Sequence, residues 1–213
     1  MDWLVSNVDT ISAIKDIILS LAAIATGVVA IYGLTTWRKE LKGKSEYTLA
    51  KEVLRAVYKV RNGFNHVRNP MMYGYEYPEG GIGPSGILKP ENESEAKLYA
   101  HQNRWKVLND AMSELEEKHL EAQVEWGPEN HEKINKTRIS VAELQYQIYE
   151  YLEKQKYSSP VTWQREHNDV EEYKQHIRKT REILYNTDSK NEFTQQINEA
   201  LNEFEKWLRP KVK

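Results

Sequence analysis

A stretch of 21 residues without a charged side chain constrains this chain more than any other feature. Residues 17–37 read IILSLAAIATGVVAIYGLTTW, and a helix of about 20 apolar residues crosses the hydrocarbon core of a bilayer. The alternatives are a buried helix of a soluble domain, which seldom runs this long without a charge, and a cleaved signal peptide. Ala23-Ile24-Ala25 mimics a cleavage box, but the preceding segment is acidic and the apolar run continues beyond that box. We therefore predict a transmembrane helix over residues 17–37, after a short extracytoplasmic N-terminus over residues 1–16.

The charges on the two sides of this span predict its orientation. Residues 1–37 hold three Asp against one Lys, net −2, whereas residues 38–68 hold nine Lys or Arg against three Glu, net +6. Residues 69–213 are acidic, net −6. Because Lys and Arg accumulate on the cytoplasmic side, we predict a single-pass protein of the bacterial inner membrane, with its N-terminus outside and its C-terminal domain in the cytoplasm. Trp3, Tyr32 and Trp37 are suited to anchor the span at the two interfaces.

One face of the span is made of small residues, and this small-residue face consists of Ala22, Ala23, Thr26, Gly27, Ala30 and Gly33. Small side chains let helix backbones approach closely in lipid, so the pattern favours a homo-oligomer in which these residues pack together or line a pore. The alternative is that Ala and Gly are simply frequent in membrane helices. A lone span cannot enclose a pathway, so any transport role requires an oligomer. The span has no ionisable residue near its centre, which argues against a proton relay.

The rest of the chain predicts helices and one long loop. Residues 38–69 read as a basic juxtamembrane amphipathic helix that is interrupted at Gly43 and restarts near Ser45. Its apolar residues form an unbroken heptad seam: Ala50, Val53, Val57, Val60, Phe64 and Val67. Residues 70–91 are a loop rich in Gly, Pro and Tyr. In this loop Tyr73, Tyr75 and Tyr77 alternate, which predicts a short extended stretch or a stacking surface.

Residues 92–213 predict a helical bundle of four long, mostly polar helices joined by short connections. A cap pair and a capping box open the first and last helices, and proline or glycine marks the breaks between them. The residues that carry these signals are Asn92 and Glu95, Gly127-Pro128, Ser159-Pro160, Ser189 and Glu192, and Pro210. The predicted fold is therefore all-α, with one N-terminal transmembrane helix followed by a cytoplasmic antiparallel bundle of long, coiled-coil-like helices.

Signatures of catalysis are missing from the sequence. There is no cysteine, no G-x-S-x-G, no His-Glu-x-x-His and no P-loop. Glu116 and His119 form the one Glu-x-x-His, half of what a di-iron bundle needs, and His101 and His119 occupy seam positions where burial is expected. We predict no enzymatic activity, no metal site and no cofactor.

The basic segment after the span is the most informative polar feature, and we call it the basic collar. Its candidate ligand-binding residues are Arg38, Lys39, Lys42, Lys44, Arg55, Lys59, Arg61 and Arg68, together with Tyr58. One interpretation is attraction to anionic lipid headgroups, worth about 1 kcal/mol per cation near the surface. The other is a site for a phosphate-bearing ligand, such as an oligonucleotide or cyclic nucleotide, between subunits, with tyrosines stacking on bases. Attraction to lipid is sufficient by itself to explain the pattern.

Residues 32–69 resemble a widespread group of small bacterial proteins that join one N-terminal span to a helical cytoplasmic domain. The run W-R-x-x-L-K-G-K-x-E-Y-x-L-A, residues 37–50, carries the likeness. The architecture also looks like the membrane effector of nucleotide-signalling anti-phage systems of the Hailong type. That resemblance implies a cone-shaped tetrameric channel controlled by a short oligodeoxyadenylate from a partner nucleotidyltransferase. It does not include a ligand motif, so it assigns no binding residue.

Two functions are consistent with these features. The first is an oligomeric single-pass effector in anti-phage defence, a channel controlled by an anionic ligand of nucleotide type. The alternative is a single-pass scaffold or adaptor without a pore, whose helical bundle recruits a protein partner. The two differ in stoichiometry, because only the channel requires a closed ring.

Overall fold

The structure, a computed structural model, describes residues 7–83, 86–89, 93–128, 131–157, 170–188 and 190–212. The chain divides between Tyr47 and Thr48 into two units. Over the described ranges the regular elements are all helices, and β pairing is limited to one isolated bridge between Ile82 and Leu88. The predicted all-α class is therefore confirmed.

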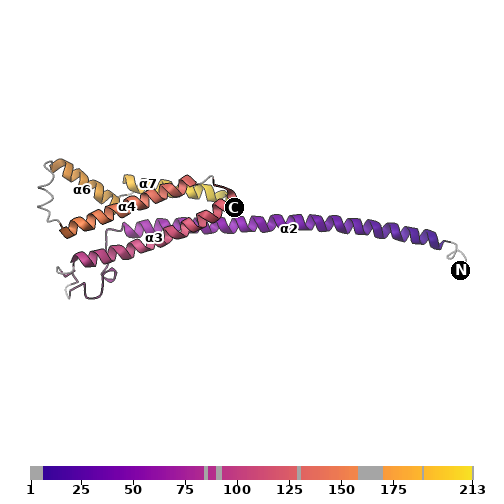
Figure 1. Ribbon diagram of the computed structural model, residues 1–213, viewed down its shortest axis with the longest axis horizontal. Helices are drawn as coiled ribbons and strands as arrows, with labels where there is room; N and C mark the ends of the chain where they lie inside the picture. Colours follow the sequence, from indigo (N-terminus) through magenta and orange to yellow (C-terminus); the bar gives the residue numbers. More distant parts are fainter. Residues whose placement is uncertain are drawn as a thin grey trace. The chain divides into compact units, whose positions relative to one another are not determined.

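The first unit consists of the N-terminal part of helix α2, which runs from Val8 to Val67 (Figure 1). Within the described residues it is the one helix long and apolar enough to cross a membrane, by length and composition. Its apolar side chains are uncovered by the rest of the chain; Ile24 is 65% exposed and Val29 70%. In water such a surface is costly, at about 25 cal/mol per Å², so the helix is suited to a lipid environment. Trp3 lies outside the described residues.

The predicted interruption at Gly43 is wrong, because α2 continues through it without a break. A glycine inside a helix costs about 1 kcal/mol relative to alanine. That penalty is small against the helix-forming residues on both sides, and no proline or capping residue accompanies Gly43. A methyl group built on Gly43 meets no atom within 4 Å, so close packing does not explain the glycine either.

The second unit contains the C-terminal turns of α2 and four further α-helices. These are α3 (Glu93–Trp126), α4 (His131–Tyr157), α6 (Val170–Leu184) and α7 (Glu192–Leu208), followed by the 3₁₀ turn η3 (Arg209–Lys211) (Figure 1). Helix α4 packs against α3, α6 and α7. Helix α3 ends at the predicted Gly127-Pro128 break, and α7 ends at Leu208, two residues before the predicted stop at Pro210. Gly127 adopts a φ of +87° at the end of α3, where a glycine is favoured. The predicted start at Ser159-Pro160 lies outside the described residues, as does Asn92.

A shared apolar core joins these helices. All six residues of the heptad seam of α2 are at most 3% exposed, and they pack with Leu108, Leu115, Leu144, Leu201 and Phe204. Helices α2 and α3 approach closely at Gly63, where an added Cβ would lie 3.0 Å from the Cα of Leu108. The predicted burial of His101 and His119 is confirmed.

Helix α7 begins differently from the prediction. Asn191 is its N-cap, and the Asn191 side-chain oxygen accepts a hydrogen bond from the backbone N–H of Thr194 at 2.9 Å. The predicted capping box of Ser189 and Glu192 is wrong, because Glu192 is the first helical residue and not the third. Ser189 itself lies outside the described residues. Asparagine is as good an N-cap as serine, so the sequence offers two acceptable starts within one turn.

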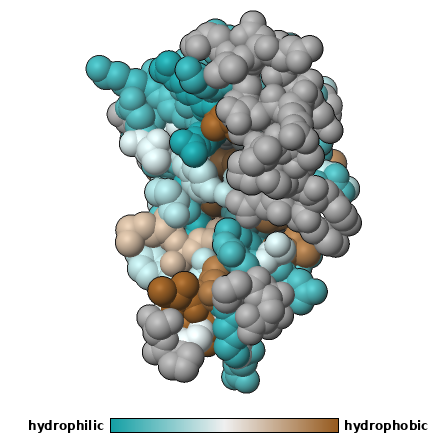
Figure 2. Space-filling view, turned by 90° about the vertical axis from the view of Figure 1, so that its left-hand side faces the viewer, coloured by the Kyte–Doolittle hydropathy of each residue, from teal (hydrophilic) through white to brown (hydrophobic). Residues whose placement is uncertain are grey.

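The segment between α2 and α3 is more ordered than its glycine content indicates. It contains a short 3₁₀ turn, η1 (Gly74–Glu76), and the bridge between Ile82 and Leu88. The rings of Tyr73 and Tyr75 are stacked, with centroids 5.6 Å apart and planes inclined by 5°. The tyrosine alternation thus corresponds to a stacked pair. Tyr75 is 82% exposed. Figure 2 shows one face of the molecule: its described residues are largely hydrophilic, with hydrophobic patches in the lower part.

Candidate functional site

The part of the basic collar nearest the span is exposed to solvent in the first unit. Arg38, Lys39, Lys42 and Lys44 all have exposed side chains on α2. Lys42 lies 3.7 Å from Glu46, one turn further along the helix, a pairing that contributes a few tenths of a kcal/mol at most, by the usual estimate of about 0.3–0.5 for such pairs. These four cations are therefore accessible to phosphate groups of lipid or of a soluble ligand.

The small-residue face of the span is also uncovered. Ala22, Ala23, Thr26, Gly27, Ala30 and Gly33 are exposed in the first unit. The Thr26 hydroxyl donates to the backbone oxygen of Ala22 at 2.8 Å, which satisfies a polar group that would otherwise be costly in hydrocarbon. A methyl group built on Gly27 or Gly33 meets nothing within 4 Å. Close approach within the chain therefore does not account for either glycine.

The collar residues of the second unit are mostly engaged by acidic side chains of other helices. Lys59 pairs with Glu114 of α3 at 2.6 Å, and Arg61 pairs with Glu205 of α7 at 2.5 Å. The Tyr58 hydroxyl donates to the same Glu205 at 3.3 Å. Burial alone would raise the pKa of Glu205, but the hydrogen bond and the charge of Arg61 outweigh it and hold that pKa below its usual value. These contacts hold α2 against α3 and α7, and Arg55 remains exposed.

Arg68 is buried, in contrast to its predicted role at an accessible site. Its side chain is 2% exposed, and its guanidinium stacks over Phe193 at 5.0 Å. Nε donates to the backbone oxygen of Ile183 at 2.8 Å, Nη2 to that of Glu182 at 2.9 Å, and Nη1 to the Thr194 hydroxyl at 3.0 Å. Burial lowers the pKa of Arg68 to about 10. The two backbone acceptors lie at the C-terminus of α6, where a cation is favoured.

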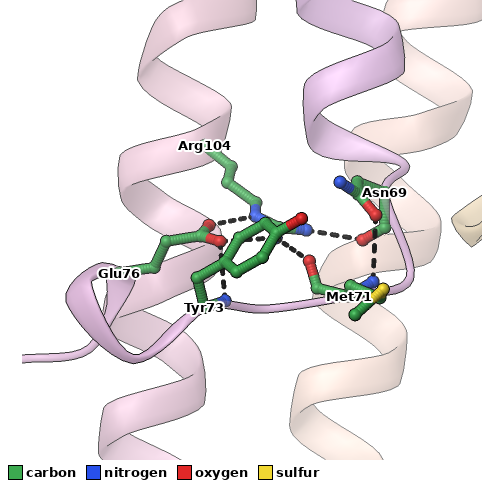
Figure 3. A network of polar contacts seen from close by, with 5 residues as sticks. All are labelled: Asn69, Met71, Tyr73, Glu76 and Arg104. Carbon is green, nitrogen blue, oxygen red and sulfur yellow. Dashed lines mark hydrogen bonds and ion pairs between the residues drawn. The ribbon is translucent and has the colours of Figure 1, made fainter.

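A buried ion pair that the sequence reasoning missed fixes the loop after α2. Arg104 of α3 is 1% exposed, and its guanidinium donates to both carboxylate oxygens of Glu76 and to the backbone oxygens of Asn69 and Met71 (Figure 3). Glu76 also accepts from the backbone N–H of Tyr73 at 3.0 Å. The hydrogen bond from Arg104 is the largest influence on the pKa of Glu76 and holds it below the usual value.

The sequence did contain a signal for Arg104. It lies four residues after Ala100 and four before Leu108, so it shares the buried stripe of α3. A charged residue inside an apolar stripe requires a buried partner, but the stripe cannot say which of the chain's acidic residues supplies it. Glu76 could not be identified in this way, because it lies in a loop without periodicity.

The two buried histidines do not form a metal site with their neighbours. Over the residues that the structure describes, no group of three or more His, Asp or Glu side chains could hold a metal ion. His101 meets the edge of Tyr151, with ring centroids 6.5 Å apart, and His119 packs against Phe204 and Trp207. Burial, with a smaller contribution from the nearby Arg104 charge, lowers the pKa of His101 to about 4. His101 is therefore a neutral core residue at physiological pH.

Comparisons with family models, curated proteins and solved structures found no match to this chain.

Proposed function

We propose that this protein is a single-pass protein of the bacterial inner membrane that self-associates through its span. In this proposal it acts as a membrane effector, a channel under the control of an anionic ligand of nucleotide type. The N-terminus lies outside and the helical unit, an antiparallel bundle, lies in the cytoplasm. The architectural resemblance to the Hailong-type membrane effector supports a role in anti-phage defence beside a partner nucleotidyltransferase and favours a tetramer.

The observation that carries this proposal is the uncovered small-residue face. Gly27 and Gly33 have no neighbour within 4 Å of an added methyl group, although Gly is among the poorer helix formers. In lipid, such residues are favoured where a second helix approaches the backbone closely. A ring of several spans that met along this face would place small side chains and the Thr26 hydroxyl near its axis.

The contacts of the collar affect where the controlling ligand can bind. Arg38, Lys39, Lys42 and Lys44 have exposed side chains, whereas Lys59 and Arg61 hold α2 to α3 and α7. A ligand that used Lys59 or Arg61 would have to compete with Glu114 or Glu205. We therefore propose the four cations nearest the span, with Arg55, as the part of the collar that meets lipid headgroups or the ligand.

A scaffold or adaptor without a pore is the second candidate. It is favoured by exposed apolar side chains on α3 and α4 of the second unit, including Leu120 at 62% and Ile139 at 61%. Aromatic and aliphatic side chains of this kind are used at protein interfaces. An adaptor requires no particular number of subunits and no conductance.

The deciding experiment measures, on the same protein, the mass of the assembly and the flux of ions across a membrane that contains it. Native mass spectrometry of the full chain in mild detergent should show a discrete ring of four or more subunits, and liposomes that contain it should release a trapped ion. Gly27→Leu and Ala30→Leu place large side chains on the small-residue face and should reduce both assembly and release. Val28→Leu, on the opposite side of the helix, is the matched control and should leave both unchanged.

Each outcome separates the two candidates. A monomer or dimer without ion release would remove the channel and leave the adaptor. A ring that releases no ions with or without added oligonucleotides would keep self-association and reject the channel.

A further inference from the structure

A small polar cavity lies beside the buried Arg68. Its volume is about 290 Å³, and it lies between the last turns of α2, residues 186–188 and the N-terminal half of α7. The polar side chains that line it include Arg61, Asn65, Arg68, Asn186, Asp188 and Thr194. Ligand sites in proteins begin at about 300 Å³, so the cavity has room for a small molecule or for one group of a larger one.

The charge of Arg68 has no acidic partner among the described residues that contact it. Its hydrogen-bond acceptors are backbone oxygens of residues 182, 183 and 185 and the Thr194 hydroxyl. Buried charges are normally paired, because the loss of hydration costs several kcal/mol per ion. Arg104 follows that rule through Glu76, whereas Arg68 has only the partial charges at the end of α6. This difference makes the surroundings of Arg68 favourable for an anion.

A chain of hydrogen bonds holds the cavity wall in place. Arg68 donates to the Thr194 hydroxyl at 3.0 Å, which donates to the side-chain oxygen of Asn186 at 3.4 Å. The Asn186 amide then donates to the side-chain oxygen of Asn65 at 3.1 Å. Because the Asn65 oxygen is the acceptor in this bond, its NH₂ group is the part of that side chain suited to donate to a ligand.

The other charges at the wall are those of Arg61 and Asp188. Arg61 shares its charge with Glu205 at 2.5 Å. Asp188 brings one negative charge, and its Oδ1 accepts from the backbone N–H of Lys190 at 2.9 Å. Asp188 equals Arg68 in the size of its charge, but the hydrogen-bond acceptors of Arg68 are backbone oxygens and the Thr194 hydroxyl.

We propose that this cavity binds an oxyanion, the phosphate or carboxylate group of a small molecule. The negative charge balances Arg68, and the oxygens accept hydrogen bonds from Arg61 and Asn65. The hydrogen bonds of Arg61 to Glu205 and Asn202 use two of the five N–H donors of a guanidinium, so other donors of Arg61 remain for the oxyanion. The site lies in the second unit and does not include the four cations nearest the span. It is a second anion site, separate from the cations proposed above for the ligand of the effector, and it goes beyond the proposed function.

The test is calorimetric titration of the full chain in detergent with sodium phosphate and, separately, sodium acetate, at constant ionic strength adjusted with sodium chloride. Saturable binding of phosphate alone identifies a phosphate group, and saturable binding of acetate alone identifies a carboxylate. We take saturation as the criterion for binding to a site. Phosphate also acts on proteins by exclusion from their surface, and that effect does not saturate. Binding is read without any membrane flux, so the cavity and the channel can fail separately.

Asn65→Asp keeps the oxygen that accepts from Asn186 and adds a negative charge at the wall. We expect it to weaken binding by at least about tenfold, because charges a few Å apart repel strongly where water is limited. Asn62→Asp is the matched control: the residue is exposed on the same helix and does not line the cavity, so binding should stay within about twofold. If Asn65→Asp does not fold, Asn198→Asp adds the same charge from α7. The proposal is overturned if neither anion binds saturably, or if the cavity and control variants bind alike.

Discussion

At the scale of single residues, two buried arginines show how the interior of the second unit accommodates positive charge. Arg104 is matched by a carboxylate and two backbone oxygens, so it ties the loop after α2 to α3. Arg68 is matched by the backbone oxygens at the end of α6, so it ties the end of α2 to α6 and α7. In both cases the guanidinium supplies several donors in fixed directions, which lysine at the same position could not do.

Glu76→Gln tests the importance of the buried pair. The substitution keeps the size of the side chain but leaves Arg104 as an uncompensated charge, so we expect it to reduce the free energy of unfolding by about 3–5 kcal/mol. Thermal and urea unfolding of the full chain, followed by circular dichroism, measures the change. Glu79→Gln, in the same loop but exposed, is the control and should have little effect. Equal stability of the two variants would show that the pair is dispensable.

His101 should make stability depend on pH. Its folded-state pKa is about 4, below the usual 6.5, so the unfolded chain binds more protons between these values. The contribution to stability is therefore complete above pH 6.5 and is lost as pH falls to about 4, a loss of about 3 kcal/mol in total. Glu76, whose pKa is also lowered, contributes above its unfolded value near 4.5 and loses that contribution at lower pH.

Unfolding titrations between pH 7 and pH 4.5 isolate the histidine. His101→Leu should flatten this part of the profile, because it removes the group that takes up the proton. His176→Gln, an exposed histidine on α6, should leave the slope unchanged. A slope that persists in His101→Leu would assign the dependence to another group.

At the scale of the element, helix α2 has an uncovered apolar N-terminal part and a C-terminal part that packs in the core of the second unit. It has glycines in both parts. Gly63 permits the close approach of α2 to Leu108 of α3, whereas Gly43 and the two glycines of the span have open space around them. Packing within the chain thus requires glycine at position 63 and not at the others. Sequence alone did not separate these cases, and Gly43 was predicted to be a break for that reason.

Gly63→Ala and Gly43→Ala should act in opposite directions. At Gly63 the new methyl group would lie 3.0 Å from both Cα and Cδ1 of Leu108, and overpacking of this kind costs about 1–3 kcal/mol. At Gly43 the methyl group meets nothing, so the helix should gain up to about 1 kcal/mol from the better propensity of alanine. Unfolding measures the first variant, and amide hydrogen exchange around residue 43 measures the second. A stabilised Gly63→Ala would contradict the close approach.

The basic collar divides into two groups at the scale of the whole molecule. The four cations nearest the span are exposed, whereas Lys59, Arg61 and Arg68 contribute to the second unit through cross-helix pairs and helix-end contacts. A continuous run of positive charge in the sequence therefore has separate roles. The four cations nearest the span are suited to contact lipid headgroups and to orient the span, whereas the other three hold helices of the second unit together.

The proposed orientation, with the C-terminus in the cytoplasm, should be weakened when the four exposed cations are neutralised together, as Arg38→Gln, Lys39→Gln, Lys42→Gln and Lys44→Gln. Positive charge close to a span sets its orientation. Reporter fusions at the C-terminus, one active in the cytoplasm and one in the periplasm, measure the fraction in each orientation. The control removes four exposed cations of the second unit, by changing Lys106, Lys179, Lys190 and Lys206 to Gln, and should keep the cytoplasmic signal. Identical results for the two sets would mean that charge near the span is not the determinant.

The sequence by itself determined the all-α class, the apolar segment and most helix ends, because these depend on local patterns. The heptad seam of α2 and the breaks at Asn69-Pro70 and Gly127-Pro128 could be assigned from spacing and backbone preferences alone. The cap of α7 shows the limit of this reasoning, since Ser189 and Asn191 are equally acceptable signals within one turn. Neighbouring structure selected Asn191, whose side chain also donates to the backbone oxygen of Glu182.

Only the tertiary structure decided which charged residues are available to a ligand. Lys59 with Glu114, Arg61 with Glu205 and Arg104 with Glu76 pair residues far apart in the chain, and spacing along a helix carries no information about such partners. The cavity beside Arg68 likewise requires α2, α6 and α7 together. Helix formation is governed by interactions between residues a few positions apart, whereas a site depends on side chains that tertiary packing brings together.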